Sequence, residues 1–376
     1  MRVLFFGCPG FGHVVPQLPL ARAMRERGDQ VAFVTAASLG PLLEAEGITH
    51  LAVGPEVPEL VAELKRVTGF DILAAPPSPE IEAEMFAGIR IDLAYQDSLA
   101  AARDFKPDLV VVEAMDYVGR IVAGALEVPH AVIALGPAVR PESVSAADAR
   151  SAVSHEARGL TPHKADWYLD TCPPGLQFDD FRAPAPSLAL RPEAYSGGAA
   201  AVPAPGGSRV RPRVLVNFGT LFVIPEVITP IVRALLDRDL DIRVTLGPMR
   251  SAEEFDLDAD RVEFVGFTPL AHLLGDVDAM VTVGGAGTVL GALAHGIPMV
   301  LTPLAADQPV HAARAAAAGA GIAFPVGDFK PEQVADAVAS VLETPGYRQA
   351  AQRVAAEIKA MASPAEVAAE LAAAIG

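Results

Sequence analysis

A histidine and two carboxylates follow apolar runs in the first third of the sequence. His13 comes after the run 2–6 and a glycine-rich turn. Glu113 directly follows the run 109–112, and Asp116 lies three residues further on. A lone histidine is usually structural, but an imidazole oriented by a carboxylate can act as a general base. His13 is therefore a candidate base, with Glu113 or Asp116 as its partner.

A glycine-rich turn, Val283-Gly-Gly-Ala-Gly-Thr288, follows the apolar run 279–283 and precedes a helix-like stretch. Such a turn lets main-chain N–H groups and the positive end of a helix approach an anion such as phosphate. No lysine follows the last glycine and the spacing is not G-x-G-x-x-G, so neither common nucleotide motif is present. A tight turn that needs glycine only for packing is the alternative, and both interpretations stay open.

Asp307 and Gln308 form a third polar group, after the apolar run 298–302 and at the start of a helix-like stretch. A carboxylate and an amide together offer acceptors and donors, which suits the vicinal hydroxyls of a sugar. Asp307 is equally well placed to cap the helix that follows. The sequence does not separate these two roles.

Metal-binding and hydrolase signatures are missing from the sequence. Asp-x-Asp pairs recur between 237 and 278, but an acid-rich chain produces them by composition alone. H-E-x-x-H and G-x-S-x-G do not occur, and the two cysteines, Cys8 and Cys172, do not form a C-x-x-C pair. We therefore predict no metal site and no cofactor.

The elements that must position these residues alternate between strands and helices. Apolar runs predict strands at 2–6, 30–35, 109–112, 131–135, 214–217, 242–246, 262–265, 279–283 and 298–302. Helix-like stretches between them indicate an α/β fold with two parallel sheets covered on both faces. The Gly/Pro/Ala-rich segment 196–213 predicts a linker between an N-terminal domain, 1–195, and a C-terminal domain, 214–376.

Composition limits the partners of this 376-residue chain. Hydrophobic residues make up 51%, which is ample for large cores, and the formal net charge of −17 repels nucleic acid and anionic membranes. No signal-peptide pattern or membrane-spanning run is found, and the low cysteine content fits a reducing compartment. We expect a cytoplasmic protein that binds small molecules; the sequence leaves its oligomeric state, homodimer included, open.

Several blocks, in order and over most of the chain, resemble the GT-B-fold family 1 glycosyltransferases, in particular bacterial enzymes that glycosylate polyketide, aromatic or enediyne-type antibiotics. The similar blocks are Gly12-His-Val-Val-Pro16, Pro107-Asp-Leu-Val-Val-Val-Glu113, Arg213 to Thr220, and Val265 to Pro309 with its Gly285-Ala-Gly-Thr288 and Asp307-Gln-Pro309. The resemblance implies two Rossmann-like domains facing across a cleft, with the last helix packing back on the first domain.

The resemblance further implies metal-independent, inverting transfer of a sugar from a nucleoside diphosphate to a hydroxyl or similar nucleophile of an apolar acceptor. A dTDP-linked deoxysugar is favoured as the donor. His13 is then the general base. Glu113 stands where the family has the Asp that orients this histidine, and Asp116 remains the alternative partner.

Donor and acceptor contacts are implied in the same way. Donor contacts fall on Gly12, Thr220, Phe267, Leu270, Gly285, Gly287, Thr288, Asp307 and Gln308. Acceptor contacts are expected in variable segments of the first domain and include Phe70, Met85, Phe86 and Trp167. Met85 and Phe86 also belong to an apolar stripe at helical spacing, which is most often part of a core.

Val283 departs from the family, which commonly has a histidine here that donates a hydrogen bond to a phosphate. This departure motivates a second hypothesis, a non-catalytic auxiliary partner of another glycosyltransferase. A GT-B nucleotide-sugar epimerase is a third. The sequence does not identify the sugar, the acceptor or the atom attacked.

Overall fold

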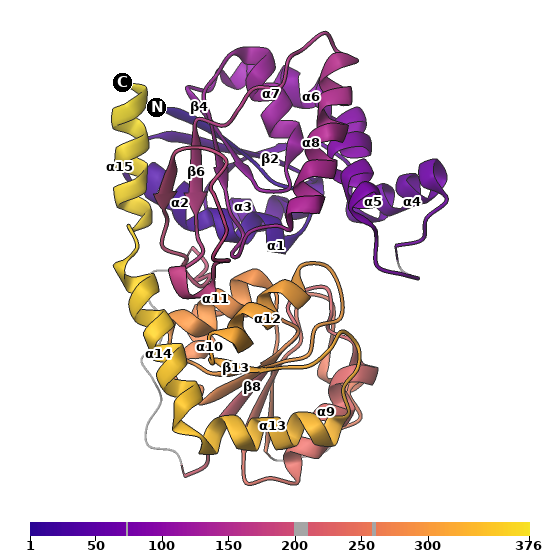
Figure 1. Cartoon of the computed structure of the whole chain (residues 1–376), viewed down its shortest axis with the longest axis vertical. Coiled ribbons are helices and arrows are strands. Elements are labelled where there is room, and N and C mark those ends of the chain that lie inside the picture. Colours follow the sequence, from indigo (N-terminus) through magenta and orange to yellow (C-terminus); the bar gives the residue numbers. More distant parts are fainter. Residues whose placement is uncertain (73, 199–209, 258–260) are drawn as a thin grey trace. The chain divides into compact units, whose positions relative to one another are not determined.

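A computed structural model of the chain describes residues 1–72, 74–198, 210–257 and 261–376, and divides them into two units (Figure 1). The first unit comprises Met1–Cys172, Phe178–Arg191 and Ala362–Gly376, and the second comprises Pro173–Gln177 and Pro192–Met361. Most of the predicted linker 196–213 lies outside the described residues, and Arg213 already begins a strand. The expected last helix is found in the first unit.

The first unit is built on a seven-stranded sheet in the order β3-β2-β1-β4-β5-β6-β7, with every described pair parallel. Its strands are β1 (Arg2–Phe6), β2 (Gln30–Thr35), β3 (Thr49–Ala52), β4 (Leu109–Glu113), β5 (His130–Ile133), β6 (Trp167–Asp170) and β7 (Ser187–Ala189). The predicted runs 2–6 and 30–35 coincide with β1 and β2. Parallel pairing puts the carboxyl ends of β1 and β4 side by side, with Phe6 opposite Val112.

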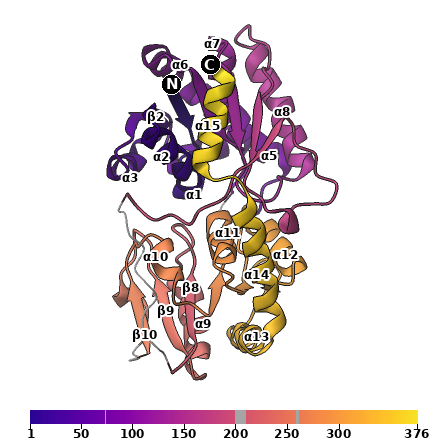
Figure 2. The ribbon, with the colours of Figure 1, turned by 90° about the vertical axis from the view of Figure 1, so that its left-hand side faces the viewer.

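Helices cover both faces of this sheet because successive strand residues point to opposite sides. The helices are α1 (Phe11–Val14), α2 (Leu18–Glu26), α3 (Gly40–Ala45), α4 (Val57–Thr68), α5 (Pro79–Ala83), α6 (Arg90–Phe105), α7 (Tyr117–Leu126), α8 (Pro141–Glu156) and α15 (Pro364–Ile375). Leu4 and Phe6 belong to the core under α6 and α7, whereas Phe5 stacks on Phe33 on the other face. Helix α15 packs against α2 in this unit (Figure 2).

The second unit is built on a six-stranded parallel sheet in the order β10-β9-β8-β11-β12-β13. Its strands are β8 (Arg213–Asn217), β9 (Asp241–Thr245), β10 (Val262–Val265), β11 (Ala279–Thr282), β12 (Met299–Leu301) and β13 (Gly321–Ala323). Its helices are α9 (Pro225–Leu236), α10 (Ala271–Leu274), α11 (Ala286–Ala294), α12 (Gln308–Ala317), α13 (Pro331–Glu343) and α14 (Pro345–Ala360). The predicted class, two parallel-sheet α/β domains, is confirmed.

The core of the second unit accounts for the residue type at position 283. Alternate residues of β11 and the turn after it, Ala279, Val281 and Val283, are buried in the cluster that α9 and α13 cover. The Val283 side chain therefore contributes to the core. None of the helices in the described part of the chain is long and apolar enough to cross a membrane.

Candidate active site

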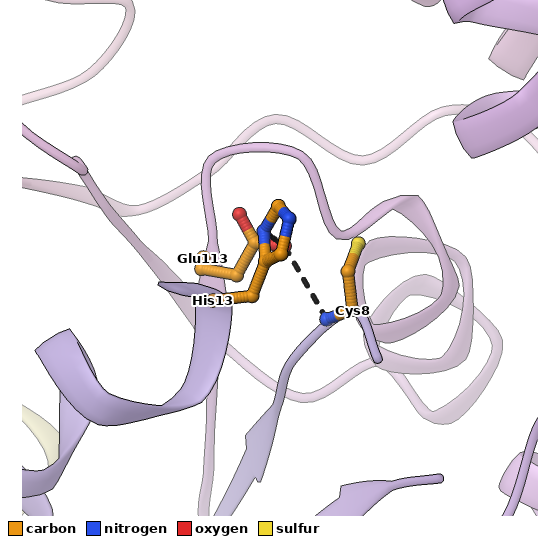
Figure 3. Close-up of side chains that lie close together, drawn as sticks. All are labelled: Cys8, His13 and Glu113. Atoms are coloured by element: carbon orange, nitrogen blue, oxygen red, sulfur yellow. Dashed lines mark hydrogen bonds and ion pairs between the residues drawn. The ribbon is translucent and has the colours of Figure 1, made fainter. Parts of the chain in front are cut away.

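His13 and Glu113 meet at the carboxyl edge of the first sheet (Figure 3). Glu113 is the last residue of β4, and the turn after the neighbouring β1 leads through Gly10, whose φ of 138° few other residues adopt, into the short helix α1. This helix carries His13, whose Nδ1 lies 3.0 Å from Glu113 Oε1. The structure thus brings together the predicted base and the first of its two candidate partners.

Glu113 is fully buried and accepts hydrogen bonds on both carboxylate oxygens. The amide of Cys8 donates to Oε1 over 3.3 Å and the amide of Met115 donates to Oε2 over 2.7 Å. Burial alone would raise the pKa of Glu113, but the charge of His13 and the hydrogen bonds from His13, Cys8 and Met115 outweigh it and lower the pKa to about 2. Glu113 is therefore ionised at neutral pH.

The ionised carboxylate defines what His13 can do. Because a carboxylate only accepts hydrogen bonds, Nδ1 of His13 carries the proton, and Nε2 is the nitrogen that can take up another. The side chain of His13 is 29% exposed, so a substrate can reach the ring. A buried carboxylate behind a partly exposed imidazole is an arrangement suited to general-base chemistry.

Asp116, the alternative partner, is engaged elsewhere. Its side chain accepts from the amide of Gly119 over 2.7 Å, which caps α7, and lies 2.7 Å from the Arg90 guanidinium. Arg90 is itself buried and donates to the carbonyl of Gly7 over 3.1 Å. Sequence reasoning missed Arg90, for which the only signal is a charge between two apolar residues, Ile89 and Ile91.

Two sets of described residues bring three possible metal-ligand atoms within 4.8 Å of one another. The first is Cys8, His13 and Glu113, but burial raises the pKa of the Cys8 thiol, and Glu113 already accepts three N–H groups. A protonated thiol and an occupied carboxylate are poor ligands. In the second set, His130, His163 and Asp166, the two Nδ1 atoms lie 3.3 Å apart, a distance that a hydrogen bond accounts for.

Two of the residues predicted to bind the acceptor, Met85 and Phe86, lie in one π-helical turn but have different surroundings. Phe86, in the π-helical turn Glu84–Ile89, has its ring centroid 6.3 Å from that of His13. Met85, in the same turn, packs against the small core of Leu60 and Leu64. Of the two, Phe86 is the one beside the candidate base, and π-helical turns are frequent at functional sites.

Phe70 and Trp167, the other two residues predicted to bind the acceptor, lie in different elements from His13. Phe70 follows α4, where its amide donates to the Thr68 hydroxyl over 3.1 Å. Trp167 begins β6, whereas Glu113 ends β4. Through the register of β5, Trp167 is level with Val111, two residues before Glu113, and lies two strands away from β4. An acceptor role for either residue stays a prediction.

The residues predicted to bind the donor, apart from Gly12, gather at the carboxyl edge of the second sheet. Thr220 follows β8, Phe267 and Leu270 follow β10, the turn 284–288 follows β11, and Asp307 and Gln308 follow β12. These strands are parallel members of one sheet. Gly12 lies next to His13 in α1, where an added Cβ would meet no described atom within 4 Å.

The glycine-rich turn has the geometry of an anion-binding site. Gly284 has a φ of 95°, and Gly285 occupies the N-cap of α11. The N–H groups of Gly285, Ala286 and Gly287 have no hydrogen-bond partner among the described residues. A Cβ added at Gly285 or Gly287 would meet no described atom within 4 Å. Three available donors at the positive end of a nine-residue helix favour binding of a phosphate group.

Asp307 and Gln308 differ in what they can offer a ligand. Asp307 stands at the N-cap of α12, but its side chain makes no capping hydrogen bond with the described residues and is 55% exposed. Gln308 is buried, and its Oε1 accepts from the amides of Leu304 and Ala305 at 2.8 and 3.0 Å. Asp307 can therefore accept from a hydroxyl, whereas Gln308 has only its NH₂ group to donate outward.

Ala306, directly before this pair, has a left-handed backbone with a φ of 56°. An L-residue with a Cβ is strained there, so Ala306→Gly is expected to raise the free energy of unfolding by about 0.5–1 kcal/mol. The matched change Ala305→Gly, at a residue without positive φ, should lower it by a similar amount through the unfolded state. Urea denaturation of both variants checks this, and a destabilised Ala306→Gly would contradict it.

Comparison with solved structures places this architecture in a known class. The chain matches the Streptomyces sp. SF2575 glycosyltransferase SsfS6 complexed with thymidine diphosphate at 25% identity, with a TM-score of 0.83 and 99% of each chain covered. It matches the glycosyltransferase SnogD from Streptomyces nogalater at 29% identity, with a TM-score of 0.80, over 100% of this chain and 99% of that one. The fold is that of the GT-B glycosyltransferases, and the protein is a glycosyltransferase.

Family models identify the branch of this class. The model "Erythromycin biosynthesis protein CIII-like, N-terminal domain" matches residues 22–219, and the corresponding C-terminal domain model matches residues 231–374. The chain belongs to this erythromycin biosynthesis protein CIII-like family. Among curated relatives, the elloramycin glycosyltransferase ElmGT of Streptomyces olivaceus is 28% identical over 395 aligned positions, covering 100% of this chain and 98% of that protein.

Proposed function

We propose that this protein is an inverting glycosyltransferase that moves a sugar, with a deoxysugar favoured, from a dTDP-linked donor to an apolar natural-product acceptor. The observation that carries the proposal is the contact between His13 and the buried, ionised Glu113 at the carboxyl edge of the first sheet. An acceptor hydroxyl is a weak nucleophile until a base removes its proton. The pair supplies such a base at neutral pH.

The proposed reaction is a single displacement. Nε2 of His13 takes the proton of the acceptor hydroxyl while its oxygen forms a bond to the anomeric carbon. The bond from that carbon to the diphosphate oxygen breaks, and its electron pair leaves with dTDP. Attack opposite the leaving group inverts the anomeric configuration. Glu113 stabilises the imidazolium that forms on His13.

The charge that develops on the departing diphosphate needs donors already in place. We assign this role to the N–H groups of Gly285, Ala286 and Gly287 at the start of α11, with the Thr288 hydroxyl beside them. Main-chain donors fixed at a helix N-terminus need little reorganisation as the charge grows. Asp307 and the NH₂ group of Gln308, which follow the adjacent strand, then contact the sugar. This scheme includes no metal ion and no cofactor.

The comparisons support the donor and acceptor classes. SsfS6 was solved with thymidine diphosphate, and the spinosyn rhamnosyltransferase SpnG, 25% identical with a TM-score of 0.81 over 99% of this chain and 100% of that one, was solved with spinosyn aglycone. Phe86, beside His13, provides apolar surface for such an acceptor. We therefore propose a thymidine nucleotide donor and a polyketide-like or aromatic alcohol acceptor.

Nucleotide binding tests the donor assignment. In calorimetric titrations dTDP should bind about 10²-fold more tightly than thymidine, because several charge-assisted hydrogen bonds to the diphosphate are added. No detectable dTDP binding at millimolar concentration would contradict the proposal. It would favour the auxiliary-partner hypothesis, whose support is that Val283 gives the turn no side-chain donor. Conversion of a dTDP-sugar to its epimer without acceptor would instead indicate an epimerase.

A further inference from the structure

A second histidine lies behind the glycine-rich turn and has no role in the scheme above. His311 is the fourth residue of α12 and is only 3% exposed. Its Nδ1 lies 3.0 Å from the carbonyl oxygen of Gly284 and 3.7 Å from Asp307 Oδ2. Helix α12 thus carries both the proposed sugar contacts and an imidazole that holds the neighbouring turn.

The contact with Gly284 settles which nitrogen of His311 carries the proton. A carbonyl oxygen only accepts, so Nδ1 must donate, and in the neutral ring Nε2 is then an acceptor. Nε2 has no hydrogen-bond partner among the described residues. The hydrogen bond that Nδ1 donates therefore goes to the Gly284 carbonyl, through which His311 acts on the glycine-rich turn.

The direction of the Gly284 carbonyl also fixes the direction of the Gly285 N–H group. The carbonyl of Gly284 and the N–H of Gly285 belong to one planar trans peptide and point in opposite directions. With glycine on both sides, this peptide can rotate at little steric cost, so the local sequence does not select its direction. The hydrogen bond from His311 does select it, because it draws the carbonyl toward α12 and turns the Gly285 N–H away from that helix.

Packing reinforces this arrangement. A Cβ at Gly284 would lie 3.1 Å from the main-chain oxygen of Gln308, so the first turn of α12 backs directly on the glycine turn. Val283 contributes an apolar side chain to the core and no hydrogen bond from its side chain. The side-chain hydrogen bond to the Gly284–Gly285 peptide thus comes from α12.

We infer that His311 is a positioning residue, which fixes the Gly284–Gly285 peptide so that the N–H groups of Gly285, Ala286 and Gly287 together face the diphosphate of the donor. The inference rests on the proposed function and deepens it. According to this inference, the side chain that holds the diphosphate site in place by a hydrogen bond comes from α12, because Val283 has no side-chain donor. It predicts that loss of the His311 hydrogen bond weakens binding of the diphosphate and leaves binding of the nucleoside unchanged.

The test compares dTDP and thymidine as calorimetric probes of wild type, His311→Ala, His311→Asn and His295→Ala. Asparagine keeps an N–H donor at the same number of bonds from the backbone as Nδ1. His295 is the matched control, because its Nδ1 also donates to a main-chain oxygen, that of Gly291, over 2.9 Å. We expect His311→Ala to weaken dTDP binding about tenfold with thymidine binding unchanged, and the other two variants to match wild type.

Each other outcome overturns the inference. Wild-type dTDP affinity in His311→Ala would show that the bond does not position the turn. An asparagine variant as weak as the alanine variant, or an equal loss of thymidine binding, would show general damage. If His311→Ala does not fold, His311→Gln displaces the donor by one bond and should show the same selective loss. If the wild type binds thymidine but not dTDP, the proposed function fails together with this inference. If the wild type binds dTDP and His311→Ala binds it equally well, only this inference fails.

Discussion

Replacing His13 with alanine is expected to lower the turnover number by about 10²- to 10⁴-fold, because the acceptor hydroxyl loses the base that removes its proton. Binding of dTDP should remain at the wild-type level, since the proposed diphosphate contacts lie in the second unit. The fold should also persist, because the His13 side chain is partly exposed. Product formation by chromatography and dTDP titration measure the two effects separately.

Two further variants control this experiment. His13→Gln keeps a polar side chain without a basic nitrogen and should be as slow as the alanine variant. His50→Ala removes a histidine of the same unit whose Nε2 lies 3.2 Å from the Thr35 carbonyl, and it should keep the wild-type rate. Near wild-type turnover of an unactivated hydroxyl acceptor by His13→Ala and His13→Gln would remove His13 from the mechanism.

Glu113→Gln is expected to have the second large effect, a loss of turnover of about 10²- to 10⁴-fold. The substitution removes the charge that stabilises the imidazolium of His13. In the wild type the amides of Cys8 and Met115 each donate to a carboxylate oxygen of Glu113, and in the variant one of these amides would face an NH₂ group instead. Steady-state kinetics should show the loss in turnover, with Glu113→Asp intermediate because the charge is kept and the reach is shorter.

The same substitution has a signature in stability against pH. The pKa of Glu113 is lowered to about 2 from an ordinary value of 4.5, so its ionised form stabilises the folded state. This contribution is complete above about pH 4.5 and is lost as the pH falls toward 2. The difference in unfolding free energy between wild type and Glu113→Gln should therefore shrink over that interval in urea denaturation. A difference that does not change with pH would contradict the assigned charge state.

Strands could be predicted where the sequence has apolar runs. The runs 2–6 and 30–35 match β1 and β2 to the residue, because buried parallel strands are almost uniformly apolar. The run 262–265 matches β10, an edge strand that is only partly buried, because three of its four residues are apolar. The strands β3, β6, β7 and β13 have three or four residues each and were not predicted, since so short a segment without a continuous run of large apolar residues carries no strand signal. Their pairing is decided by the neighbouring strand.

The site could be predicted in part. The candidate site residues that follow strand ends could be predicted from the sequence, because the carboxyl ends of parallel strands lie at the same edge of a sheet. The sequence does not decide whether Glu113 or Asp116 is the partner of His13. The decision depends on Arg90, which lies 26 positions before Asp116 in the sequence and which α6 brings into contact with it. The sequence also does not show that the Gln308 side-chain oxygen accepts hydrogen bonds from the amides of Leu304 and Ala305. Side-chain direction is set by packing between elements and is absent from local sequence patterns.

Product stereochemistry tests the central claim most directly. Wild-type protein would be incubated with dTDP-linked hexoses and deoxyhexoses and with aromatic and macrolactone alcohols, and the products followed by NMR. We expect one dTDP released for each glycoside formed, with the anomeric configuration of the glycoside opposite to that of the donor. A glycoside that retains the donor configuration, or consumption of the donor without a glycoside, would contradict the account.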